Sequence, residues 1–215
     1  MQPWIRQTRA ELASQRQPEA LDDEHFTESL AAAVIAEYSA EGDLVLDPFG
    51  GFGTVPRVAT RMGRRAVAVE LQPDRAELIA RRAPGAEVIA GDARGLASLV
   101  RRPVDLCLTS PPYMAANDHP ENPLTAYSTD DGDYQTDLAE LGAVFGVVAG
   151  LLRPGGHLVV NVANVMERDV LTPLAFDLAG RIGAHLPLRQ DVCLCWDIQP
   201  EGLAGDYCLV FARPA

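Results

Sequence analysis

The chain has 215 residues, of which 47% are apolar and 6% aromatic, and its formal net charge is −12. This size and composition predict one globular domain with a sizeable core and exclude collagen-like, coiled-coil and disordered chains. No apolar run approaches the roughly 18 residues that a membrane helix needs, and the N-terminus lacks the apolar region of a signal peptide, so we expect a cytoplasmic protein. The acidic balance also weakens the case for nucleic-acid binding.

Two residue types narrow the chemistry. All 18 basic residues are arginine, which excludes mechanisms that need a catalytic lysine, such as a Schiff base or a Walker P-loop. The four cysteines lie in apolar runs, without C-x-x-C spacing or nearby histidines: Cys107, Cys193, Cys195 and Cys208. We therefore expect buried free thiols and neither a zinc site nor a disulfide framework.

The N-terminal part of the chain is polar over residues 1–24 and is expected to form an arm or loose helix. It precedes one domain over residues 25–215. This domain begins with a predicted helix over 27–39, for which Thr27 is a suitable N-cap.

Apolar runs then alternate with helix-like segments. The predicted strands are 44–47, 66–70, 87–90, 104–109 and 157–162. The predicted helical segments are 54–62, 74–82, a short link near 94–100, and 136–152. A further helix over 170–184 leads to strands 192–196 and 206–211, which are close enough in sequence to form a hairpin. This pattern predicts an α/β fold with a mostly parallel sheet, helices on both faces and an antiparallel terminal hairpin.

A glycine-rich turn, DPFGGFGT, follows the first predicted strand from Asp47 to Thr54 and leads into a helix. In a doubly wound sheet, ligands lie at the carboxyl ends of the strands, where glycines let a cofactor approach the backbone and the helix N-terminus. The alternative is a tight turn that serves only the fold.

Acidic residues stand at the ends of the next two strands. Glu70 ends one strand, and Asp92 follows the other after Gly91. We identify no basic partners that would make them simple ion pairs, and both are expected at the same edge as the glycine turn. A carboxylate in the position of Glu70 suits two ribose hydroxyls, and Asp92 suits an adenine amino group. In series they predict a nucleoside pocket, whereas singly they would be solvated loop acids.

The fourth strand ends in the segment TSPPY, which runs from Thr109 to Tyr113. Two prolines fix φ and remove two backbone donors, so the carbonyls of Ser110 and Pro111 are held outward as acceptors beside an aromatic ring. This arrangement suits a planar amine. A rigid loop with a surface tyrosine is the alternative.

These four features, in this order, resemble the S-adenosylmethionine-dependent amino-methyltransferases that modify cytosine N4 or adenine N6 in DNA. The resemblance is close over residues 25–113 and looser beyond. It implies a Rossmann-like class I methyltransferase fold with a mostly parallel seven-stranded sheet. It also implies S-adenosyl-L-methionine as cofactor and S-adenosyl-L-homocysteine as product. The expected cofactor-binding residues are Thr27, Asp47, Phe49, Gly51, Gly53, Thr54, Glu70 and Asp92.

The resemblance also implies a catalytic segment: Ser110, Pro111, Pro112 and Tyr113. Serine before Pro-Pro-Tyr is the variant typical of cytosine-N4 enzymes. The lone pair of an exocyclic amine is delocalised, so the amine must be pulled toward tetrahedral geometry before it attacks a methyl sulfonium. Ser110 Oγ and the Pro111 carbonyl would accept its two N–H groups while Tyr113 stacks on the base. No metal is required, and a base in a duplex would first be flipped out.

The chain departs from the family in two places. The family has His-Pro where this chain has His25-Phe26, and we find no room for a target-recognition domain. For a DNA substrate, a separate recognition subunit is then one alternative, which the sequence leaves open. The loop over 114–135 is acidic, which disfavours a phosphate backbone and suggests either a solvated lid or a specificity element.

The same chemistry on RNA, a small amine-bearing metabolite, or a protein or peptide amide is therefore the alternative function. A non-catalytic module that keeps the fold is a third interpretation. The arginines cluster between Arg57 and Arg102, which predicts solvated helix and loop faces more than a phosphate track.

Overall fold

The computed structural model describes residues 1–18, 26–116, 123–126 and 132–215. These residues form nine strands in one sheet: β1 (Trp4–Gln7), β2 (Leu44–Asp47), β3 (Arg65–Glu70), β4 (Glu87–Ala90), β5 (Val104–Thr109), β6 (Leu152–Glu167), β7 (Val170–Thr172), β8 (Leu188–Trp196) and β9 (Leu203–Ala212). The α-helices are α1 (Arg9–Gln15), α2 (Glu28–Tyr38), α3 (Thr54–Arg61), α4 (Pro73–Arg82), α5 (Leu96–Leu99), α6 (Tyr134–Leu151) and α7 (Leu174–Gly183). Two short 3₁₀ turns are η1 (Ala93–Gly95) and η2 (Pro123–Thr125).

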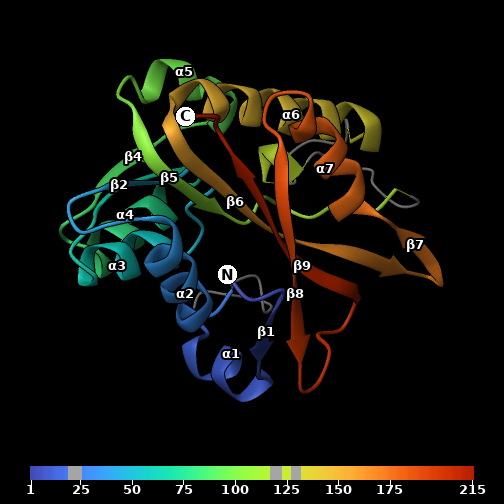
Figure 1. The fold of residues 1–215 in the computed structure, drawn as a ribbon. Coiled ribbons are helices and arrows are strands. Elements are labelled where there is room, and N and C mark those ends of the chain that lie inside the picture. The colour runs from blue at the N-terminus through green and yellow to red at the C-terminus, as the bar shows by residue number, and fades with distance from the viewer. Residues whose placement is uncertain (19–25, 117–122, 127–131) are drawn as a thin grey trace.

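The strand order is β1-β8-β9-β6-β5-β2-β3-β4, with β7 paired to β6 beside this path (Figure 1). Strands β2 to β6 pair in parallel with their neighbours, whereas β9 is antiparallel to both β6 and β8. The predicted α/β fold with an antiparallel C-terminal hairpin is therefore confirmed. All seven predicted strands are present, and two further strands, β1 and β7, join them.

Helices cover both faces of the sheet (Figure 1). On one face, α2 and α3 place Leu30 and Val58 in a core cluster with strand residues such as Val45. On the other face, α6 and α7 contribute Phe145 and Leu178 to a second cluster. Central strands that are buried on both faces explain the near-continuous apolar runs in the sequence.

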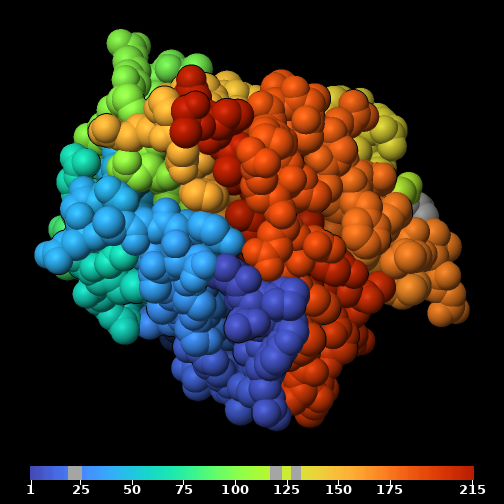
Figure 2. Space-filling model, viewed as in Figure 1, coloured from blue at the N-terminus to red at the C-terminus, as the bar shows by residue number. Residues whose placement is uncertain are grey.

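The N-terminal segment differs from the expected loose arm over 1–24. Trp4–Gln7 forms β1, which pairs in parallel with β8 so that Gln7 lies opposite Trp196. Thr8 caps α1 by accepting the Glu11 N–H at 3.2 Å. Figure 2 shows these N-terminal residues (dark blue) packed beside the C-terminal strands (orange to red). The sequence signal was weak because one face of β1 is exposed, so its apolar pattern is short.

The helix predicted over 170–184 begins later, because Val170–Thr172 forms β7, which pairs antiparallel with the end of β6. Arg168 and Asp169 connect the two strands with φ values of 49° and 62°. Positive φ at both residues of a two-residue loop is typical of a hairpin turn that usually contains Asn or Gly. Arg-Asp carries no such signal.

The prediction of buried thiols holds for Cys107 and Cys208, whereas Cys193 and Cys195 are exposed. Alternate residues of β8 face opposite sides of the sheet, and Leu194 between these two cysteines points into the core. No helix among the described residues is long and apolar enough to cross a membrane.

Candidate active site

The predicted site residues converge on the carboxyl edge of the sheet. Asp47 and Glu70 are the last residues of β2 and β3, and Ser110 directly follows β5. Asp92 lies two residues beyond β4. Because these four strands are parallel, their ends lie at one edge, which is where open α/β sheets bind ligands.

The glycine turn between β2 and α3 divides into two kinds of position. A Cβ on Gly50 or Gly53 would lie 2.8 or 3.1 Å from side-chain atoms of Ile79, so these glycines allow α4 to pack closely. Among the described residues, a Cβ on Gly51 would meet only the Phe49 carbonyl oxygen, at 3.8 Å. Gly51 and Gly53 also have positive φ, at 52° and 80°. Gly51 is therefore the position at which another molecule has room to approach the backbone.

Glu70 links this turn to the end of β3. Its Oε2 accepts the Gly51 N–H at 2.7 Å, and its Oε1 accepts the Gln72 N–H at 2.9 Å. Burial raises the pKa of Glu70, while these backbone hydrogen bonds act in the opposite direction. The carboxylate thus helps to shape the glycine turn as well as facing the same edge.

Asp47 lies deeper, with 3% of its surface exposed. Its Oδ1 accepts the Thr109 hydroxyl at 2.7 Å and the Phe49 N–H at 3.2 Å. Burial raises the pKa of Asp47 to about 7, with a smaller contribution from the charge of Glu70 and an opposing one from its hydrogen bonds. Asp47 therefore joins β2 to β5 directly below the site and titrates near neutral pH.

Asp92 has a basic partner, contrary to the expectation from the sequence. The side chain of Arg94 donates to both of its carboxylate oxygens, at 2.7 to 3.1 Å, and also reaches Glu140 of α6 at 3.2 Å. Burial would raise the pKa of Asp92, but the hydrogen bonds and charge of Arg94 outweigh it and lower the pKa. The sequence analysis missed this pair because a partner two residues away requires the tight η1 turn that Asp92 itself caps.

Thr27 and Thr54 belong to the helices that begin at this edge. Thr27 is fully buried; its hydroxyl accepts the Leu30 N–H, which confirms the predicted N-cap, and donates to Gln7 at 2.5 Å. Thr54 is the buried first residue of α3. Phe49 in the turn lies 6.2 Å from Phe145, between ring centroids. Thr27 thus serves contacts within the fold.

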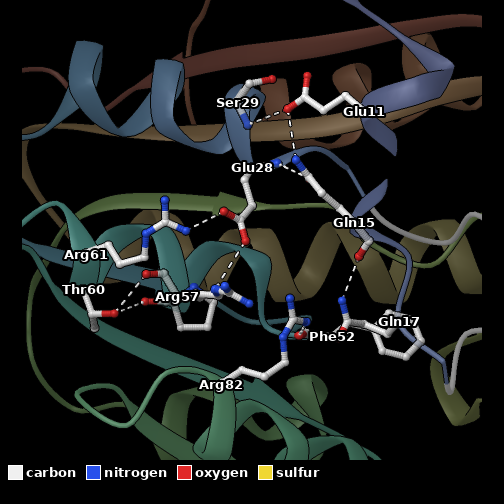
Figure 3. A network of polar contacts seen from close by, with 11 residues as sticks. Glu11, Gln15, Gln17, Glu28, Ser29, Phe52, Arg57, Thr60, Arg61 and Arg82 are labelled. Carbon is white, nitrogen blue, oxygen red and sulfur yellow. Dashed lines mark hydrogen bonds and ion pairs between the residues drawn. The ribbon is translucent and has the colours of Figure 1, made fainter. Parts of the chain in front are cut away.

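The N-terminal segment is also fixed to the helix that follows the glycine turn (Figure 3). Gln15 of α1 accepts the Glu28 N–H at 2.7 Å. The Glu28 carboxylate in turn pairs with Arg61 at 2.5 Å and Arg57 at 3.3 Å, both on α3. Helices α1, α2 and α3 are therefore joined through Glu28, whose backbone N–H contacts α1 and whose carboxylate contacts α3.

The Ser110–Tyr113 segment directly follows β5, which lies between β6 and β2 in the sheet. Pro111 is buried, and Ser110, Pro112 and Tyr113 are half-buried. The Tyr113 ring packs against the α6 and α7 side of the core. Burial, and then the charge of Asp206, raises the pKa of its hydroxyl far above the ordinary value. The hydroxyl end therefore points into the protein, which the prediction of a stacking ring did not anticipate.

A polar cluster beside Tyr113 was missed from the sequence. Asp206 at the start of β9 is 4% exposed, and it accepts Asn161 Nδ2 at 2.8 Å and Trp196 Nε1 at 3.0 Å. Burial raises the pKa of Asp206, while its hydrogen bonds from Trp196 and Asn161 oppose the shift. No motif marks these residues, because they meet only through the antiparallel pairing of β9 with β6 and β8.

Two predictions concern residues outside the described ranges. His25 is one of them, and half of the acidic loop over 114–135 is the other, since residues 117–122 and 127–131 are not described.

Part of the chain matches a known protein family. Residues 7–81 match the DNA methylase family N6_N4_Mtase. The match includes the glycine turn and Glu70, and it ends before Asp92 and Ser110.

Solved structures of methyltransferases share the fold. TrmN from Thermus thermophilus is 21% identical with a TM-score of 0.64 over 87% of this chain, which spans 49% of the length of TrmN. The N-methyltransferase NodS from Bradyrhizobium japonicum WM9, in complex with S-adenosyl-L-homocysteine, is 14% identical with a TM-score of 0.64 over 96% of each chain. A methyltransferase from Pyrococcus furiosus is 12% identical with a TM-score of 0.63, covering 94% of this chain and 88% of that one.

Residues 7–81 therefore carry the pattern of the DNA methylase family, and the chain as a whole shares the class I fold of these solved methyltransferases.

Proposed function

We propose that the chain transfers a methyl group from S-adenosyl-L-methionine to an exocyclic amino group of a nucleobase, cytosine N4 or adenine N6 in DNA. The observation that carries this proposal is the convergence of the glycine turn, Glu70, Asp92 and the Ser110–Tyr113 segment on one sheet edge. The DNA methylase match over residues 7–81 supports DNA as the substrate.

The β2 and β3 ends fit the cofactor. The open approach at Gly51 admits a ligand to the backbone, and the buried acids Asp47 and Glu70 suit a cation. We assign the ribose hydroxyls to Glu70, whose oxygens each retain a lone pair beyond the backbone bonds that they accept. We assign the adenine amino group to Asp92, where it would share the carboxylate with Arg94. When bound, S-adenosyl-L-methionine supplies an activated methyl group on a sulfonium.

The Ser110–Tyr113 segment suits the amine. Ser110 Oγ and the Pro111 carbonyl oxygen would accept the two N–H groups, which draws the nitrogen lone pair out of conjugation and aims it at the methyl carbon. The rigid Pro111-Pro112 backbone holds these acceptors in place. Because the Tyr113 hydroxyl is buried, only the exposed part of its ring is available to a base.

We assign the catalytic domain to residues 25–215. Because β1 and α1 pack on that domain, their contacts contribute to its folding stability. Recognition of a DNA sequence would then come from a separate chain.

The decisive experiment is mass spectrometry of DNA nucleosides from cells that express the chain. N4-methylcytosine or N6-methyladenine should accumulate with the native chain and not with Ser110→Ala. Absence of both modified nucleosides from DNA would overturn the DNA assignment.

The same chemistry on RNA, a small amine-bearing metabolite, or a protein or peptide amide is the second candidate, and the acidic segment around Asp133 and Asp137 favours those of these substrates that lack a phosphate backbone. Two solved structures with a similar fold, from Clostridium thermocellum and Streptococcus thermophilus, are described as rRNA methylases. Transfer of labelled methyl groups into fractionated cell extract separates the candidates, because RNA, DNA, peptide and small-molecule fractions are counted separately. Label confined to DNA would eliminate the alternatives.

A further inference from the structure

Four arginines from three parts of the chain line one cleft far from the candidate active site. The cleft has a volume of about 430 Å³ and contains Arg101, Arg102, Arg153 and Arg213. Arg101 and Arg102 precede β5, and Arg153 is the second residue of β6. Arg213 directly follows β9. Because β9 is antiparallel to β6, all three places lie at the amino edge of the parallel strands, opposite Ser110.

The lining of this cleft is positive and otherwise apolar. None of the described residues that line it is acidic, and Leu151 and Pro154 contribute apolar walls. The chain as a whole has a net charge of −12. The guanidinium groups that line the cleft are therefore opposite in sign to the net charge of the chain.

Contacts with the fold hold three of the arginines in place. Arg213 Nη1 donates to the carbonyl oxygens of Gly150, at 3.1 Å, and Leu152, at 2.6 Å, where α6 ends. Arg153 Nε pairs with Asp105 at 3.1 Å, and Arg102 pairs with Glu87. Each contact uses only part of a guanidinium that has five N–H donors, so donors remain on every side chain.

Arg101 differs from the other three. It makes no ion pair or side-chain hydrogen bond with any residue that the structure describes. No contact among the described residues therefore neutralises the charge of Arg101 in the cleft. Figure 2 shows the C-terminal residues (dark red) beside the start of β6 (yellow-orange) at the top of the molecule, where this edge lies.

We propose that this cleft binds a phosphate-bearing anion. Guanidinium forks match phosphate oxygens in pairs, and four of them suit a multiply charged group better than a single carboxylate. The volume lies within the range of small-ligand sites, and the apolar walls suit the organic part of a phosphate ester. The phosphate would come either from a small free phosphate compound or from a nucleic-acid backbone.

Inorganic pyrophosphate is the first probe. It should raise the Tm of the native protein by about 3 °C beyond sodium chloride of equal ionic strength, if it binds at the cleft. Arg101→Gln should weaken pyrophosphate binding about tenfold by calorimetry, without changing the Tm of the unliganded protein, because Arg101 has no partner to lose. The matched control is Arg81→Gln, which removes an equally charged side chain, 65% exposed, on α4.

A 20-nucleotide single-stranded DNA, followed by fluorescence anisotropy, distinguishes the sources. Loss of DNA affinity in Arg101→Gln but not in Arg81→Gln supports the cleft and identifies a nucleic-acid backbone as the source. Loss of pyrophosphate binding alone supports the cleft and identifies a free phosphate compound. Pyrophosphate and DNA binding that are both absent, or both equal in the Arg101 and Arg81 variants, overturns the proposal. None of these outcomes depends on methyl transfer, so the proposal stands apart from the proposed function.

Discussion

The two halves of the carboxyl edge are assembled in different ways. In the β2–β4 half (residues 44–95), each polar side chain stands at or just beyond the end of its own strand, and its partners are backbone N–H groups of adjoining turns, the Thr109 hydroxyl of β5 or the nearby Arg94. In the β6–β9 half (residues 152–212), the cluster around Asp206 takes one side chain from each of three strands. The polar side chains of the first half all stand at the ends of parallel strands, whereas those of the second half meet only through the antiparallel return of β9.

The largest expected effect concerns Asp47 in the β2–β4 half. Because the folded chain raises the pKa of this buried acid to about 7, the folded state binds its proton more tightly than the unfolded chain does. This contribution is complete below about pH 4 and is lost as the pH rises through 7, with a total of at most about 4 kcal/mol.

Asp47→Asn removes that titration. The unfolding free energy of the native chain, measured by urea denaturation, should fall relative to the variant as the pH rises from 4 to 7. A difference between the two proteins that is constant over this range contradicts the assigned burial of Asp47.

Glu70→Ala should weaken S-adenosyl-L-methionine binding by about 10- to 100-fold, which corresponds to hydrogen bonds with a charged group. The variant should also lower the Tm, because the Gly51 and Gln72 N–H groups lose their acceptor. Calorimetry and thermal unfolding measure the two effects. Glu70→Gln is the control, since it keeps one acceptor oxygen; an unchanged dissociation constant in Glu70→Ala would show that the ribose assignment is wrong.

Asp206→Asn tests the β6–β9 half at a residue that is buried about as deeply as Asp47. The amide would place an N–H group against one of the two donors from Asn161 and Trp196, so stability should fall by about 2 kcal/mol. Cofactor affinity should remain within a factor of two or so, because the change lies outside the β2–β4 half. A large loss of cofactor binding would contradict the division of the edge into two halves.

The smallest expected effect is that of Tyr113→Phe. Removal of a buried hydroxyl should lower the free energy of unfolding by about 1 kcal/mol, and most of the activity should remain because the ring is kept. Tyr113→Ala should lower activity further, by roughly 1 to 3 kcal/mol of lost stacking. Equal activity of the Phe and Ala variants in a methyl-transfer assay would argue against a planar base as substrate.

The β2–β4 half could be predicted because strand ends and turn residues are adjacent in the sequence. The mostly parallel strands, the Thr27 cap and the position of Asp47, Glu70 and Ser110 at strand ends could be predicted for that reason. What local pattern could not reveal were contacts made across strands. These include Gln7 with Thr27 and the partners of Asp206.

Two further differences have physical causes of the same kind. The Arg168-Asp169 turn lacks the residues that usually mark a hairpin, so β7 was predicted as helix. Arg153 and Arg213 of the amino-edge cleft are distant in the sequence from Arg101 and Arg102, so the sequence did not place these four arginines together.

The central claim is that Ser110 acts on the amine while the β2–β4 half holds the cofactor. Its most direct test measures the S-adenosyl-L-methionine dissociation constant and the rate of labelled methyl transfer to DNA side by side for Ser110→Ala. The account predicts an unchanged dissociation constant and a transfer rate at least about 100-fold lower, as expected when a preorganised hydrogen-bonding group is lost from the reacting centre. Transfer at the native rate, or loss of cofactor binding in step with activity, would contradict it.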